Sequence, residues 1–281
     1  MLLAFSAHLY LWRITVKLKF LLSAILGISL LGTALADDLD EIKKRGTLVV
    51  GVTSDPPFAQ LDTKKQTYTG YDVDFAVAIA KQMGVKVLIK DISTADRIPK
   101  LQAKDVDVVI ATLTKNAERE KLIDFSYGYF VTGQKFIVHK GKIKAIEDLT
   151  NATIGTISGS TSEKQLRREM PHAKVVLFPG PDQGFVALGK GEIDAFSTDE
   201  PILAGLYNKM PNKNDFEIPN ASVSLEVYGI GMRKGEKRLV DEVNKIIVGM
   251  EQTGEASKIF ERWFGPNSTI PLTRLFKINA K

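Results

Sequence analysis

The residues best suited to binding chemistry lie at the end of an apolar segment near the middle of the chain. The β-branched run at 108–110 gives way to the hydroxyl residues Thr112 and Thr114, and Arg119 follows. This order predicts a buried strand whose C-terminal end presents two hydroxyls and a guanidinium. Because arginine offers a planar pair of donors and hydroxyls satisfy further lone pairs, the set suits an α-carboxylate. Taken alone, the stretch also fits a strand, a turn and a surface arginine.

A second strand end carries an acidic residue in the matching place. The helix-turn-strand pattern around Asp107 recurs around Asp194. Thr112 lies five residues after Asp107, and Asp199 lies five residues after Asp194. Open α/β sheets bind ligands beyond the C-terminal ends of their strands. If the two units face each other, Arg119 and Asp199 offer opposite charges to one zwitterion. The alternative is that Asp199 only caps the helix that follows it.

The surrounding segments alternate between strand and helix patterns, which predicts an α/β fold with helices on the faces of parallel sheets. Two such series predict two lobes. Asp72 is a candidate N-cap for the first of these helices, and Arg97 begins the second. A last strand and two helices have no sheet of their own and are expected to return to the first lobe. The expected strands lie at 46–53, 85–90, 106–111, 134–139, 152–157, 175–178, 193–196 and 225–232, and the helices at 72–84, 97–103, 161–170, 182–188, 200–207, 236–253 and 255–264.

Composition excludes several classes of function. The 281 residues are 44% apolar and 25% charged, as in ordinary globular proteins. The formal charge is +5, but residues 1–36 hold three cations and no acid, so the remainder carries 35 cations against 33 acids, or +2. No basic stripe indicates a nucleic-acid partner. The absence of cysteine excludes disulfides and Cys-based zinc sites. His139 and His172 are isolated in sequence, so we expect no metal and no cofactor.

Residues 1–36 have the build of a secretory signal. Lys17 and Lys19 precede an apolar run at 20–31, and Ala34 and Ala36 flank Leu35 before the first acid. This run is shorter than the ~20 residues that a spanning helix needs. We therefore expect cleavage after Ala36 and a periplasmic location.

A set of ordered motifs resembles the amino-acid-binding periplasmic solute-binding proteins of ABC importers, family 3. The resemblance covers about residues 38–265. It implies a type II periplasmic-binding-protein fold, with two mainly parallel α/β lobes joined by two hinge strands. The implied boundaries are 37–131 and 227–265 for the first lobe, 132–226 for the second, and 266–281 for a polar tail. The motifs are Gly70-Tyr71-Asp72-Val73-Asp74, Arg97-Ile98-Pro99, Asp107 to Arg119, Asp124-Phe125-Ser126, Gly159-Ser160-Thr161-Ser162, Asp199-Glu200-Pro201, Tyr228-Gly229-Ile230 and Trp263-Phe264-Gly265.

The resemblance also implies roles for single residues at the end of the ligand that all amino acids share. Arg119 and Thr114 correspond to the α-carboxylate site, together with Ser160 and Thr161 at a helix N-terminus. Asp199 corresponds to the α-ammonium acceptor, with Thr112 beside it.

Three further residues are expected to contact the side chain of the ligand. Tyr71 corresponds to an aromatic wall of the pocket. Arg97 resembles the arginine of glutamate/aspartate binders, which favours an acidic ligand. Some of those binders have a second arginine at the loop position that Val52 occupies here, and Asp55 adds an acidic residue nearby. Glutamine or another polar amino acid therefore remains an alternative ligand.

The function expected from these residues is capture of an L-amino acid, without turnover, by a monomer that delivers it to an ABC permease in the inner membrane. One alternative is an enzyme on the same scaffold, similar to cyclohexadienyl dehydratases, with Asp55, Glu226 or Asp199 as general acid or base. A sensor domain on the same fold is another.

Overall fold

The computed structural model describes residues 37–143 and 145–279. The expected signal segment, residues 1–36, lies outside the described residues. Within the described part, no helix combines the length and the apolar character needed to cross a bilayer.

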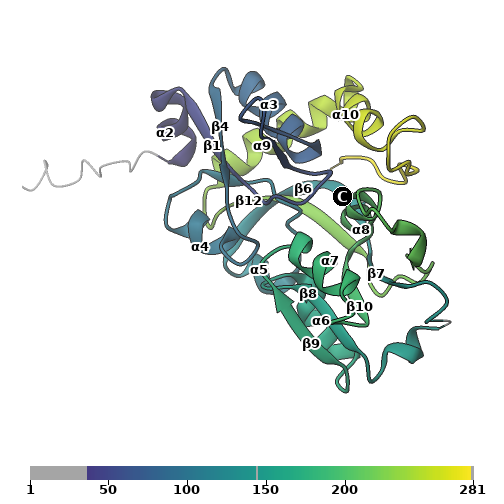
Figure 1. Cartoon of the computed structure of the whole chain (residues 1–281). Helices are drawn as coiled ribbons and strands as arrows, with labels where there is room; N and C mark the ends of the chain where they lie inside the picture. Colours follow the sequence, from purple (N-terminus) through teal and green to yellow (C-terminus); the bar gives the residue numbers. More distant parts are fainter. Residues whose placement is uncertain (1–36, 144, 280–281) are drawn as a thin grey trace, which may run out of the picture. The chain divides into compact units, whose positions relative to one another are not determined.

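Two five-stranded sheets form the framework of two lobes (Figure 1). The first sheet has the order β4 (Lys86–Asp91), β1 (Thr47–Val52), β5 (Val108–Val109), β12 (Glu226–Arg233) and β6 (Ile123–Thr132). The second has the order β11 (Phe216–Glu217), β7 (Gln134–His139), β10 (Ala195–Asp199), β8 (Thr153–Ile157) and β9 (Lys174–Phe178). A small hairpin, β2 (Gln60–Asp62) and β3 (Thr67–Thr69), follows β1.

Both sheets are mixed, although a mainly parallel sheet was expected in each lobe. Strand β1 pairs in parallel with β4 and β5, and β8 pairs in parallel with β9 and β10. Strands β12 and β7 pair antiparallel with their neighbours. The antiparallel pairs arise where the chain crosses between sheets, because β6 leads into β7, and β11 is followed by β12. These crossings sit at the hinge between the lobes.

Helices cover the sheets as the alternating pattern predicts (Figure 1). In the first lobe they are α2 (Asp38–Arg45), α3 (Tyr71–Met83), α4 (Arg97–Gln102), α5 (Ala117–Glu120), α9 (Lys237–Gln252) and α10 (Glu255–Phe264). In the second they are α6 (Thr161–Glu169), α7 (Pro181–Gly189) and α8 (Glu200–Tyr207), with 3-10 turns at Ile146–Leu149 and Lys213–Asp215.

The apolar run that contains β5 is buried on both sides of its sheet. Val108 and Ile110 belong to one apolar cluster, whereas Val109 and Ala111 belong to another. Side chains alternate along a strand, so a strand covered on both faces reads as a continuous apolar run. The same rule places Phe136 of β7 against the α6 side and Ile137 against the α7 side. These sheets therefore fix the strand ends from which the polar loops project.

Residues 265–279 form no helix or strand, yet they pack closely on the folded chain. Leu272 N–H donates to the Phe264 carbonyl at 2.8 Å, and Arg274 forms an ion pair with Glu251 of α9. Asn208 Nδ2, at the end of α8, donates to the Thr269 carbonyl at 2.7 Å. The segment read as a polar tail thus contacts both lobes.

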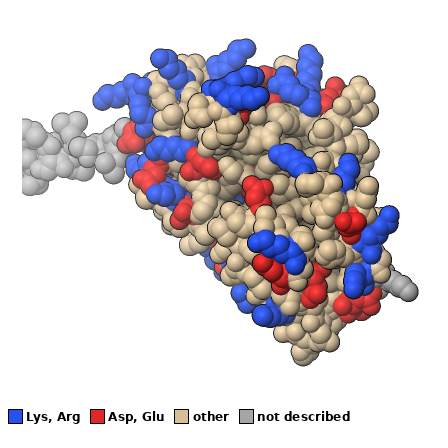
Figure 2. Space-filling model, viewed as in Figure 1, with Lys and Arg blue, Asp and Glu red and all other residues tan. Residues whose placement is uncertain are grey.

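The exposed charges on the face drawn in Figure 2 are mixed in sign. Lys and Arg lie among Asp and Glu over much of this view. Elsewhere in the described chain, exposed charges form ion pairs such as Lys234–Asp124 and Arg238–Asp40. Such exposed pairs contribute little stability. The charged side chains of the strand-end loops, described below, are buried instead.

Candidate ligand-binding site

Polar side chains from both lobes meet at the C-terminal ends of the parallel strands. Thr114 Oγ1, after β5, lies 3.4 Å from Thr161 Oγ1, at the start of α6 in the second lobe. Arg119 Nη2 donates to the Gly159 carbonyl at 3.4 Å across the same boundary. Tyr228 of β12 donates its hydroxyl to Asp199, which ends β10. The strand-end residues expected to form a site therefore do come together.

Arg119 is a buried residue of the one-turn helix α5. Asn116 begins this helix and accepts a hydrogen bond from Arg119 N–H at 2.9 Å. Arg119 is 8% exposed, and its Nη1 donates to the Thr114 carbonyl at 2.9 Å. Burial, and then the charge of Arg97, lower the pKa of Arg119 to about 9, so it keeps its charge at neutral pH. The interpretation as a surface arginine is wrong.

Thr112, whose carbonyl accepts a hydrogen bond from Arg97, adopts a strained backbone conformation. Its φ of +47° lies in the left-handed region, which costs a β-branched residue ~1–3 kcal/mol. The Thr112 N–H donates to Asp72 Oδ2 at 3.0 Å, and Tyr129 donates its hydroxyl to the other oxygen at 2.8 Å. Burial raises the pKa of Asp72 to about 7, against the effect of these two bonds. Asp72, expected to cap α3, makes no cap there and instead holds the Thr112 loop.

The Asp199 side chain points toward Tyr228 and does not cap the helix after it. Its side chain makes no cap bond to α8, so the reading as a helix cap is wrong. One oxygen accepts the Tyr228 hydroxyl, and within the described chain the buried Oδ1 has no partner. Burial raises the pKa of Asp199 to about 7, while the Tyr228 bond acts to lower it. Asp199 can therefore accept one further donor.

Arg97 and Asp55 carry opposite charges in the first lobe, and each affects the pKa of the other although no ion pair joins them. Arg97 is 3% exposed, and it donates through Nε to Thr94 and through Nη1 to Ala111 and Thr112 carbonyls at 2.9–3.2 Å. Asp55 is 3% exposed and accepts the Thr53 hydroxyl at 2.6 Å. Burial raises the pKa of Asp55, and Thr53 and the Arg97 charge oppose this. Burial lowers the pKa of Arg97, against the Asp55 charge.

Two expected site residues are used for other purposes in this structure. The Ser160 hydroxyl donates to the Ile157 carbonyl at 2.6 Å and accepts from Glu163 N–H at 3.0 Å, so it caps α6. Tyr71 is fully buried, and its hydroxyl donates to the Tyr129 carbonyl at 2.9 Å. Its ring lies 4.9–6.5 Å from rings that include Phe75 and Phe260. Tyr71 thus belongs to the aromatic core, which corrects its expected place on a pocket wall.

Sequence reasoning missed three residues that hold the site together. Asp72 was predicted only to be a helix cap. Tyr228 belongs to a motif of the family resemblance, but neither Tyr228 nor Tyr129 was given a role in the site. Their bonds join segments 57 and 29 residues apart, which no local pattern reveals. Within residues 37–143 and 145–279, no three His, Asp or Glu side chains are placed to hold a metal ion.

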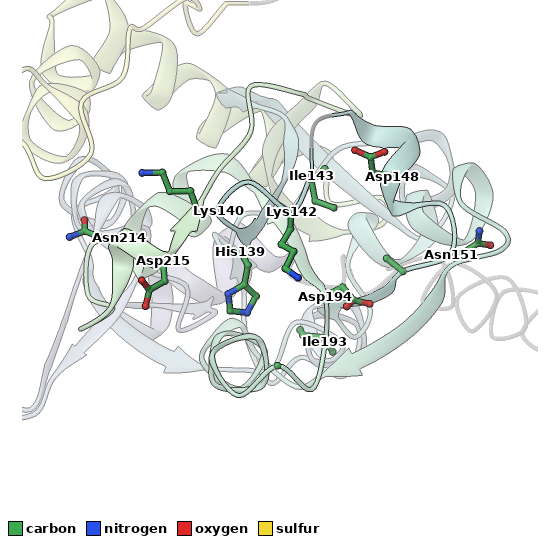
Figure 3. Close-up of a pocket in the computed structure, with 12 residues that line it drawn as sticks. His139, Lys140, Lys142, Ile143, Asp148, Asn151, Ile193, Asp194, Asn214 and Asp215 are labelled. Atoms are coloured by element: carbon green, nitrogen blue, oxygen red, sulfur yellow. The ribbon is translucent and has the colours of Figure 1, made fainter.

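Two pockets flank the meeting point of the lobes. One, of about 320 Å³, is lined by 53–55 and 91–94 of the first lobe and 179–183 of the second. The other, of about 570 Å³, is lined by 114–118, by α6 residues and by 223–226. A wider pocket of about 910 Å³ lies on the second lobe, with His139, Lys142 and Asp194 near its centre (Figure 3). None of the ligand-binding residues described above, from either lobe, lines this pocket, so we do not assign the site to it.

Comparison with known proteins places the chain in a family. The model of the bacterial extracellular solute-binding proteins, family 3, matches residues 48–266. The ABC transporter glutamine-binding protein GlnH of Bacillus subtilis (strain 168) is 35% identical over 233 residues, covering 81% of this chain and 84% of GlnH. The glutamate/aspartate import solute-binding protein of Escherichia coli (strain K12) is 33% identical over 264 residues, covering 86% and 87%. The structure of an ancestral arginine-binding protein bound to glutamine is 40% identical, with a TM-score of 0.75 and coverage of 79% and 99%. The chain belongs to family 3 of the bacterial extracellular solute-binding proteins.

Proposed function

We propose that this protein captures one free L-amino acid between its lobes, without turnover, and delivers it to an ABC permease. It acts as a monomer outside the cytoplasm, after removal of residues 1–36. The observation that carries the proposal is a set of buried charged side chains that form no ion pair. Within the described residues, none of Arg97, Arg119, Asp55 and Asp199 takes part in an ion pair, although all four are more than nine-tenths buried.

Unpaired buried charges are costly, because burial removes their hydration. A zwitterion relieves this cost at both ends. Its carboxylate accepts the two-pronged donor set of Arg119 with the Thr114 and Thr161 hydroxyls, and its ammonium donates to Asp199 Oδ1. Because these groups come from both lobes, ligand binding favours the closed arrangement.

The opposite charges of Arg97 and Asp55 support a polar, uncharged side chain on the ligand. Arg97 alone favours an acidic side chain, as expected from the sequence. Asp55 is buried in the electrostatic field of Arg97, however, and a ligand carboxylate there would meet a like charge. A carboxamide presents its oxygen to Arg97 and its NH₂ to Asp55. We therefore place glutamine ahead of glutamate and aspartate, in agreement with the glutamine-binding relative.

The test is calorimetric titration of the refolded, ligand-free protein with each of the twenty L-amino acids. We expect one site per chain and the tightest binding for glutamine. Glutaramic acid, which is glutamine without its α-amino group, should bind far more weakly because Asp199 stays unpaired. The absence of heat with every amino acid would contradict the proposal. Turnover of prephenate in the same preparation would favour the enzyme alternative.

A further inference from the structure

Tyr228 occupies a fixed position between the two halves of the site. It is fully buried. Its ring stacks on the Phe130 ring with 5.7 Å between the centroids, and it meets the Phe58 ring edge-on with 5.6 Å between the centroids. Its backbone forms a bridge with Thr114, and Gly229 N–H donates to the Leu113 carbonyl at 3.0 Å. The strand that carries Tyr228 therefore also holds the loop that carries the carboxylate-binding Thr114.

The tyrosine hydroxyl reaches across to the other lobe. It donates to Asp199 Oδ2, and within the described part of the chain the buried Oδ1 has no hydrogen-bond partner. Together with the burial of the Asp199 side chain, this bond restricts rotation of the carboxylate and so limits the directions in which Oδ1 can point.

We propose that Tyr228 is a positioning residue, which orients Asp199 so that Oδ1 receives the ammonium group of the ligand. This inference rests on the proposed function, because it assigns the ammonium group to Asp199. The rigid connection between Tyr228 and Thr114 then sets the spacing between the ammonium and carboxylate subsites. Free L-amino acids share this spacing, so the device selects the class of ligand and not the side chain.

The hydroxyl also acts on the charge of Asp199, since donation to a carboxylate favours its ionised form. Burial acts in the opposite direction, and the pKa of Asp199 remains near 7. Other charged groups face it from neighbouring elements: Glu226 of β12, Arg97 of α4, Asp55 after β1 and Arg119 of α5. A phenylalanine at position 228 leaves these four groups in place and removes only the hydroxyl.

The experiment compares Tyr228→Phe with wild type by calorimetry with L-glutamine between pH 5.5 and 9. The control is Tyr207→Phe, which removes a hydroxyl from the last residue of α8. We expect Tyr228→Phe to weaken binding roughly 10- to 100-fold, as for loss of a bond to a charged group. The loss should grow as the pH falls, because Asp199 without the hydroxyl takes up a proton at higher pH. Tyr207→Phe should follow wild type.

A second measurement does not depend on the ligand. The carboxyl ¹³C resonance of Asp199, assigned with Asp199→Asn, is titrated in ligand-free wild type and in Tyr228→Phe. We expect a higher midpoint in the variant, and an unchanged midpoint would overturn the proposal. Tighter glutamine binding by Tyr228→Phe would also overturn it, since Tyr228 would then compete with the ligand. If wild type binds no amino acid while the midpoint shifts, the proposed function fails and the Tyr228–Asp199 coupling stands.

Discussion

The two arginines of the site are similarly buried but held in different ways. Arg97 donates to three carbonyls, all of the first lobe, so it is fixed before the lobes close. Arg119 donates to one carbonyl of its own lobe and to Gly159 of the other, at 3.4 Å. Under the proposed function, the end of the ligand common to all amino acids is bound across the two lobes, so closure is coupled to the part of the ligand that does not vary. The ligand side chain is expected beside Arg97 and Asp55 of the first lobe, at a pocket that residues 179–183 of the second lobe also line.

The largest effect should follow removal of the guanidinium that spans the cleft. Arg119→Ala leaves the α-carboxylate without its paired donors and should weaken every amino acid about 1000-fold, or ~4 kcal/mol. Arg262→Ala, which removes an exposed arginine of α10, is the control. Calorimetry with glutamine checks this. Binding within tenfold of wild type would show that the carboxylate lies elsewhere.

Arg97→Ala should have a smaller and more selective effect. We expect about 100-fold weaker glutamine binding, at the lower end of the range for a buried charged partner. The affinity for norvaline, which has no polar end, should change little, so the ratio of the two affinities should fall. Arg119→Ala should lower both affinities together. Equal losses for both ligands in Arg97→Ala would break the distinction between the two arginines.

The close approach of the lobes predicts an effect at Gly159. Its φ is +74°, and an added Cβ would lie 2.8 Å from Ala95 Cα in the first lobe. Gly159→Ala should hinder closure and weaken glutamine binding about 10-fold. Gly141 has a similar φ of +73° and nothing within 4 Å, so Gly141→Ala has the same backbone strain without the clash. Small-angle scattering should show compaction by glutamine in Gly141→Ala and less in Gly159→Ala. Equal compaction would argue against this account.

The smallest effect is a dependence of ligand choice on pH. Burial raises the pKa of Asp55 above the ordinary range, so this carboxyl gains a proton earlier as the pH falls. Neutral Asp55 no longer repels a ligand carboxylate and can donate to it. The ratio of glutamate to glutamine affinity should therefore rise several-fold from pH 8 to pH 5. Asp55→Asn should show a high ratio of glutamate to glutamine affinity at both pH 8 and pH 5. A wild-type ratio that falls as the pH is lowered would place Asp55 away from the side chain of the ligand.

Local patterns in the sequence were sufficient for the lobes and for the strand-end residues. The apolar run before Thr112 and Thr114 predicts a strand covered on both faces, and the observed clusters confirm it. The pairing of Asp72 with Tyr129 and of Asp199 with Tyr228 depends on tertiary packing, because each bond joins separate elements. The misplacement of Tyr71 has the same origin. An aromatic residue at the start of a helix faces either the cleft or the core, and only the positions of Phe75 and Phe260 decide which.

The most direct test of the central claim is a crystal structure of the protein with L-glutamine. The account predicts the α-carboxylate within hydrogen-bond distance of Arg119 and the ammonium group on Asp199 Oδ1. The carboxamide should lie between Arg97 and Asp55. A ligand bound in the reverse direction, with its α-carboxylate on Arg97, would contradict the assignment of the two arginines.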